Sequence, residues 1–136
     1  MSEPLILIVG AADTGRAPMA VALLRRMLRR QGAPWRVESA GVVGHDDDPA
    51  EPEARDALLA MGLDLSAHTA RSLSDALVAE ARLLVAVESG VGRVVRARYP
   101  AAQLSTAPKP FAQSALARGC DPTRWDQWRT RLARRR

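Results

Sequence analysis

The chain has 136 residues, 47% of them hydrophobic, and a formal net charge of +5, which excludes a disordered or fibrous chain and suits one globular domain. No apolar run approaches the roughly 20 residues that a membrane-spanning helix needs. The single cysteine, Cys120, excludes an internal disulfide framework and a multi-cysteine metal site. We therefore expect one domain over residues 1–136, located in the cytoplasm.

Apolar runs alternate with segments whose apolar residues recur at helical spacing, and Gly- and Pro-rich loops separate them. The first helix should carry Pro18 in its first turn, where a missing N–H costs nothing. We expect strands at 4–9, 35–38, 83–87 and 103–106, and a loop over 39–52, which is rich in Gly, Asp and Pro. We expect helices ending at 31–32, over 53–61, 73–81 and 88–99, and from about 123 to the C-terminus.

This alternation predicts an α/β fold, a single three-layer doubly wound domain built on a four-stranded parallel sheet. In such sheets ligands bind beyond the carboxyl ends of the strands. The loop after the first strand, Gly10, Ala11, Ala12, Asp13, Thr14, Gly15 and Arg16, is therefore the expected site. Its small residues can form a nest of N–H groups for an anion, and the Arg16 guanidinium can hold two oxygens of that anion. Any doubly wound fold has such a turn, so the loop by itself is weak evidence.

The segment 5–24 (LILIVGAADTGRAPMAVALL) resembles the opening of the low-molecular-weight protein tyrosine phosphatases and the related arsenate reductases. That opening consists of an apolar strand, Cys, five residues, Arg, Ser, Pro, Met, Ala and an apolar helix. Here Gly10 stands in the cysteine position, Arg16 in the arginine position and Ala17 in the serine position. The resemblance continues in order through 39–41, 62–71, 83–88, 99–100 and 121–122, and implies the phosphotyrosine phosphatase I-like fold.

The resemblance implies phosphoryl transfer through a cysteinyl-phosphate, with a thiolate nucleophile of lowered pKa and an aspartate as general acid. Gly10 cannot attack, Ala17 has no hydroxyl to assist the leaving thiolate, and Asp13 replaces an asparagine that braces the loop. Losing a covalent nucleophile costs on the order of 10⁴–10⁶ in rate. We therefore expect a chain that does not work as a phosphatase; if it is active, it should be a phosphoric monoester hydrolase.

The resemblance also assigns roles outside the loop. Asp121 matches the general acid, and it also suits the N-cap of the last helix, the role that it can keep without a nucleophile. Cys120, beside that carboxylate, is a poor replacement nucleophile, because a neighbouring negative charge raises a thiol pKa, and a lone cysteine does not supply the relay of an arsenate reductase. Ser39 and His68, together with Asp13, match a network that holds the loop in shape.

His45 and the acidic run 46–48 could suggest a metal site, but consecutive carboxylates cannot all face one ion, so a solvated acidic turn is the preferred interpretation. We expect no metal and no cofactor.

Three functions remain open at this point. The first is an inactive phosphatase-like protein that binds phosphate or another oxyanion, a phosphorylated protein or a protein partner through the 10–16 loop. The second is a phosphatase that works by a non-standard route. The third is a nucleic-acid or membrane-surface binder that uses its arginines; their clusters are short and scattered, so nucleic acid is not favoured. The sequence gives no indication of oligomeric state.

Overall fold

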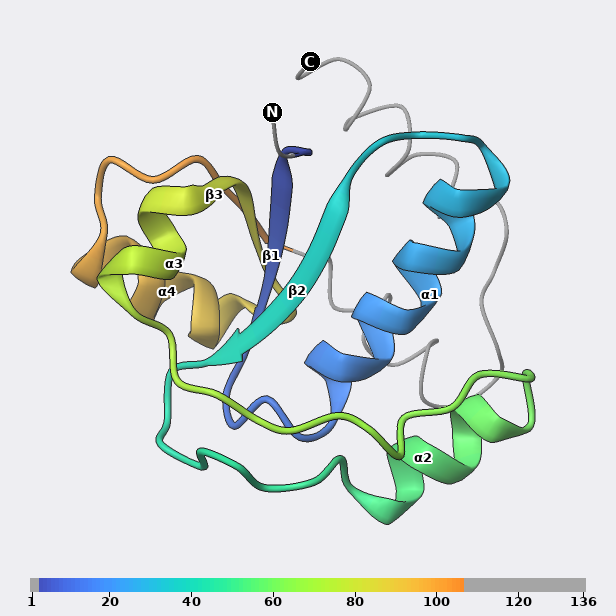
Figure 1. Ribbon diagram of the computed structural model, residues 1–136. Coiled ribbons are helices and arrows are strands. Elements are labelled where there is room, and N and C mark those ends of the chain that lie inside the picture. The colour runs from blue at the N-terminus through green and yellow to red at the C-terminus, as the bar shows by residue number, and fades with distance from the viewer. Residues whose placement is uncertain (1–2, 107–136) are drawn as a thin grey trace.

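The computed structural model describes residues 3–106 of the chain (Figure 1). The described part is an α/β sandwich in which four parallel strands lie in the order β2-β1-β3-β4. The strands are β1 (Leu5–Gly10), β2 (Arg36–Gly41), β3 (Ala81–Ala86) and β4 (Leu104–Thr106), and the helices are α1 (Arg16–Arg30), α2 (Pro52–Leu59), α3 (Asp75–Glu80) and α4 (Ser89–Arg98).

Helices cover both faces of the sheet, which confirms the three-layer, doubly wound fold that the sequence predicts (Figure 1). Every residue of β1 is buried, as expected for a parallel strand that is covered on both faces. Alternate residues of β1 pack against helices on opposite faces of the sheet. Ile6 and Ile8 pack in the hydrophobic cluster that includes residues of α1 and α2. Leu7 and Val9 pack in the cluster that includes Val91 and Val95 of α4.

Most predicted elements lie within a few residues of their observed bounds. α1 ends with Gln31 as its C-cap and Gly32 at a φ of 64°, a left-handed conformation that glycine adopts without strain. Ser74 caps α3 through its hydroxyl, which accepts a hydrogen bond from the Leu77 N–H at 3.3 Å. One boundary is wrong: residues 39–41, expected in a loop, continue β2, because they pair in register with the end of β1.

The helix expected from about residue 123, together with Cys120 and Asp121, lies outside the described residues. Among the helices that the structure describes, none combines the length and apolar character that crossing a bilayer would need.

Candidate anion-binding site

The loop between β1 and α1 turns its carbonyl groups toward the surrounding protein. Four of its carbonyl oxygens accept hydrogen bonds from three other segments of the chain. Gly10 O accepts from Val42 N at 3.1 Å, Ala11 O from Val43 N at 2.8 Å, Asp13 O from His68 Nε2 at 2.7 Å, and Thr14 O from Glu51 N at 2.7 Å. The surrounding segments therefore fix the loop through hydrogen bonds to its carbonyl oxygens.

The N–H groups of the same loop behave differently. Within residues 3–106, no hydrogen bond has an N–H of residues 11–15 as its donor. Gly15 is the N-cap of α1 and provides no side-chain cap, and the first turn of α1 carries no acidic residue. The helix thus begins with unpaired donors and the positive end of its dipole facing the loop. Such a combination suits an oxyanion, so residues 10–16 form a candidate anion-binding site, called the nest below.

The loop lines a cavity of about 250 Å³ together with Glu51, Glu53, Ala54 and Val87. Gly10 lies at its base, buried at the end of β1. A Cβ placed on Gly10 would lie 3.0 Å from the Cβ of Ala17 and 3.7 Å from Cγ2 of Val87. Any side chain at position 10 would therefore require Ala17 to move by a few tenths of an ångström.

Arg16 makes an ion pair with Glu88: its Nη2 atom lies 2.7 Å from Oε2 of that carboxylate, and about a third of each side chain is exposed. The sequence predicts Arg16 as the group that holds the anion. In the described structure this guanidinium is already engaged by a carboxylate from the start of α4, so a bound anion would share it with Glu88.

Glu51 brings a second carboxylate to the loop. Its Oε1 atom accepts from the Thr14 hydroxyl at 3.2 Å, and its Oε2 atom lies 3.0 Å from the position that a Cβ on Gly15 would occupy. Because Gly15 has no side chain, the Glu51 carboxylate can lie this close to the loop backbone.

Asp13 is the bracing residue on the loop itself. Its side chain is fully buried, and its backbone has a φ of 60°, a conformation that Asp and Asn tolerate better than most residues. One carboxylate oxygen, Oδ2, accepts from the Arg71 N–H at 3.1 Å. The other, Oδ1, has no hydrogen-bond partner among the described residues and lies 3.7 Å from Nε2 of His68.

This environment affects the protonation of Asp13. Burial raises the pKa of its carboxyl group, although the nearby Ser39 side chain, the hydrogen bond from the Arg71 N–H and the charges of His68 and Arg71 act against that rise. His68 carries a proton on Nε2, since its partner at 2.7 Å is a carbonyl oxygen, which can only accept. The loop is thus braced by a histidine N–H and a carboxyl group that is costly to ionise.

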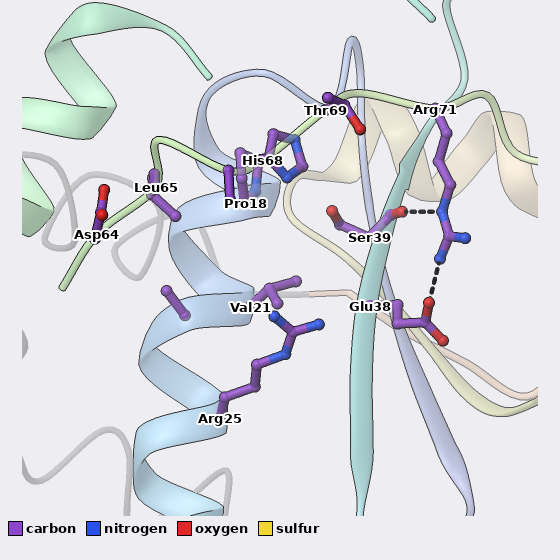
Figure 2. Close-up of a pocket in the computed structure, with 12 residues that line it drawn as sticks. Pro18, Val21, Arg25, Glu38, Ser39, Asp64, Leu65, His68, Thr69 and Arg71 are labelled. Carbon is purple, nitrogen blue, oxygen red and sulfur yellow. Dashed lines mark hydrogen bonds and ion pairs between the residues drawn. The ribbon is translucent and has the colours of Figure 1, made fainter. Parts of the chain in front are cut away.

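The segment that carries His68 is clamped to the end of β2 (Figure 2). Arg71 donates from Nε to Ser39 O at 3.0 Å and from Nη2 to Glu38 at 2.9 Å. Its backbone carbonyl accepts from Gly41 N at 2.8 Å. A second cavity, of about 360 Å³, has Ser39, His68 and Arg71 among the residues that line it. Figure 2 shows these residues between α1, β2 and the segment that carries His68. Two of the bracing residues, Ser39 and His68, therefore border this second cavity.

The structure brings all the predicted residues of the loop, residues 10–16, to one cavity, and it places Asp13, Ser39 and His68 together beside it. The predicted role of Asp121 falls outside the described residues. In the acidic turn, Asp46 accepts from the N–H and hydroxyl of Ser72 at 2.7 and 3.1 Å, and Asp48 pairs with His45 at 3.2 Å. These contacts turn the carboxylates toward separate partners.

Arg71 closes the 62–71 match of the family resemblance, but the sequence assigns it no role. Glu51 and Glu88 also contact the site without a predicted role: Glu51 belongs to a stretch expected as loop, and Glu88 ends the 83–88 match. No local pattern distinguishes either from other surface glutamates, because each meets the loop only after the chain has folded.

The fold and the loop define the class of the protein: a doubly wound α/β domain with a candidate anion site between its first strand and first helix. The chain belongs to the low molecular weight phosphotyrosine protein phosphatase family, whose model matches residues 5–106.

Curated relatives agree with this assignment. The chain is 34% identical over 96 residues to a probable low molecular weight protein-tyrosine-phosphatase, EpsP, of Ralstonia nicotianae, covering 71% of this chain and 63% of that protein. It is 30% identical over 94 residues to a protein-arginine-phosphatase of Bacillus subtilis, covering 69% of this chain and 62% of that protein. The chain thus spans less than two thirds of the length of these relatives.

Solved structures show the same fold. A low molecular weight protein tyrosine phosphatase from T. tengcongensis matches with a TM-score of 0.72 at 30% identity, covering 76% of this chain and 73% of that one. A YwlE arginine phosphatase mutant with a phosphorylated active-site serine matches with a TM-score of 0.72 at 28% identity, covering 75% and 68% of the two chains.

Proposed function

We propose that this chain binds a phosphoryl group, free or carried on a protein, in the 10–16 loop and does not transfer it. One observation carries the proposal: within residues 3–106, the N–H groups of residues 11–15 donate no hydrogen bond, while the first residue of the loop is Gly10, which has no side chain. Donors for an oxyanion are thus retained where the nucleophile is missing.

Membership of the family supports the ligand class, because the named relatives are phosphatases of phosphorylated tyrosine or arginine. Their activity requires a group that can accept the phosphoryl group, and Gly10 and Ala17 offer neither a thiol nor a hydroxyl. Water could attack a bound phosphate ester instead, but Asp13 is buried against His68 and Glu51 is hydrogen-bonded to Thr14. We therefore favour binding without turnover over the non-standard hydrolase. We also propose a cytoplasmic location, on the grounds of the lone cysteine.

Titration of the ¹⁵N-labelled protein with inorganic phosphate tests the proposal. Binding should shift the backbone amide resonances of residues 11–16, because these N–H groups would change from unpaired donors to donors to the anion. Arg16→Gln should weaken binding severalfold, since hydrogen bonds to a charged partner are about twice as strong as neutral ones.

The matched control is Arg82→Gln, which removes the same charge from an exposed residue near the start of β3, at the edge of the sheet remote from the loop. It should leave phosphate affinity within about twofold, as expected for a remote charge screened by solvent. Amide shifts spread over the surface, or equal effects of the two variants, would replace the proposed site with non-specific attraction to a basic protein.

A further inference from the structure

We propose that the nest, if it binds phosphoryl groups as proposed above, prefers those that have a positive charge beside them, and that Glu51 determines this preference. The inference concerns the ligand class of the site and rests on the proposed function.

Glu51 is built into the rim of the nest. It is the N-cap residue of α2, yet its side chain makes no capping hydrogen bond to its own helix. The backbone N–H instead donates to Thr14 O at 2.7 Å, and the carboxylate accepts from the Thr14 hydroxyl at 3.2 Å. A capping carboxylate normally stabilises the helix that it begins. This one faces the neighbouring loop.

Glu88 is a second N-cap residue that contacts the loop. It precedes α4 and likewise makes no side-chain hydrogen bond to its own helix, because its carboxylate pairs with Arg16 at 2.7 Å. Two N-cap carboxylates thus contact residues of the nest, and that of Glu88 already compensates the charge of Arg16.

The cavity of the nest has more acidic than basic residues in its lining. Of the described residues that line the cavity, Asp13, Glu51 and Glu53 are acidic and Arg16 is basic. The N–H groups of the loop attract an oxyanion, whereas Glu51 and Glu53 repel a doubly charged phosphate that has no counter-charge. A ligand with a cation close to its phosphoryl group replaces this repulsion with attraction.

Two sources can supply such a cation. It can belong to the phosphorylated side chain itself, as in phosphoarginine, or to a basic residue next to a phosphorylated residue in a peptide. Both give the same local chemistry, an oxyanion in the nest and a positive charge at Glu51. The protein has a net charge of +5 and therefore repels basic ligands at long range. A preference for basic ligands must then come from local contacts with Glu51.

Isothermal titration calorimetry with four ligands tests the inference: inorganic phosphate, a phosphotyrosine peptide with arginine neighbours, the same peptide with alanine neighbours, and phosphoarginine. The wild-type protein should bind the arginine-flanked peptide or phosphoarginine roughly two- to fivefold more tightly than the alanine-flanked peptide, as a partly exposed ion pair allows. The ligand that shows the preference identifies the source of the cation.

Glu51→Gln keeps an acceptor for the Thr14 hydroxyl and removes the charge. It should strengthen binding of inorganic phosphate and abolish the preference. Glu80→Gln, which removes an equal charge from the residue that pairs with Arg36 at the opposite edge of the sheet, should change neither.

The outcomes separate the two proposals. If phosphate binds and Glu51→Gln changes the affinity for all four ligands by the same factor, Glu51 is only a general repulsive charge and the inference is wrong. If none of the four ligands binds either protein, the proposed function itself fails.

Discussion

At the scale of single residues, position 10 combines two properties. Gly10 has no nucleophilic side chain, and a Cβ placed on it would lie only 3.0 Å from that of Ala17. A larger residue at position 10 must therefore shift Ala17 slightly, so this position is limited sterically as well as chemically.

The double variant Gly10→Cys, Ala17→Ser should show weak but measurable hydrolysis of p-nitrophenyl phosphate, because a thiol would return to the base of a nest that still has Arg16 beside it. Gly10→Ala is the matched control: it adds the Cβ without the thiol, should cost about 1 kcal/mol of stability through overpacking, and should remain inactive. Activity in the alanine variant would show that turnover does not depend on position 10.

Asp13 gives a pH-dependent prediction. The raised pKa of its carboxyl group means that the folded protein binds this proton more tightly than the unfolded chain. Its contribution to stability is thus complete at acid pH and is lost as pH rises through the folded-state pKa. Asp13→Asn, which cannot ionise, should therefore stabilise the protein at pH 7.5 by about 1 kcal/mol.

Urea unfolding of both proteins at several pH values measures this effect. The advantage of the variant should shrink as pH falls, because a protonated Asp13 no longer carries the buried charge. A variant that is less stable than the wild type at pH 7.5 would mean that the carboxylate is ionised and well paired with His68.

At the scale of elements, the nest loop rests on the end of β2. The backbone of Gly41 touches the loop so closely that a Cβ there would lie 2.7 Å from Ala11 O and 2.8 Å from Ala12 C. On its other side, Gly41 exchanges hydrogen bonds with residues 71 and 73. Gly41 therefore lies between two backbone segments, the nest loop and residues 71–73, and neither offers a flexible side chain that could make room for a Cβ.

Gly41→Ala should destabilise the protein by roughly 3 kcal/mol, the upper part of the usual range for overpacking, and should weaken phosphate binding by displacing the loop. Gly44→Ala is the control, since Gly44 is exposed and a Cβ there meets nothing within 4 Å. Denaturation midpoints measure the first effect. Equal stability of the two variants would mean that the loop can shift freely.

The ion pair between α1 and α4 gives another prediction at this scale. Glu88→Gln should free the Arg16 guanidinium and raise the affinity for inorganic phosphate by roughly two- to fivefold, the amount that a partly exposed pair is worth. Calorimetric titration measures the change. A loss of affinity would mean that Glu88 positions Arg16 for the anion instead of competing for it.

The elements also show where sequence reasoning succeeds and where it stops. Apolar runs and helical spacing predict β1, α1 and β3 well, because burial on both faces of a parallel sheet leaves a local pattern. The extension of β2 to Gly41 depends on pairing with β1, which residues 39–41 do not encode locally. The contact between Thr14 and Glu51 spans 37 residues, and only folding brings the two together.

At the scale of the whole molecule, the parallel sheet brings the ends of β1 and β2 and the starts of α1, α2 and α4 to one edge (Figure 1). The family resemblance predicts this fold correctly, and the place of the site at this edge stays a prediction. The fold, however, fixes only where an anion could bind. We propose that the carboxylates of Glu51 and Glu88, held in place by contacts between elements, determine which anions bind there.

One measurement tests the central claim, that the chain binds phosphoryl groups without turning them over. The ¹⁵N-labelled protein is mixed with p-nitrophenyl phosphate, and its amide spectrum and the release of p-nitrophenol are followed in the same sample. We predict shifts of the amide resonances of residues 11–16 while the ester stays intact. Release of p-nitrophenol above about 1 s⁻¹, the ordinary range for enzymes, or unchanged resonances at millimolar ester, would contradict the claim.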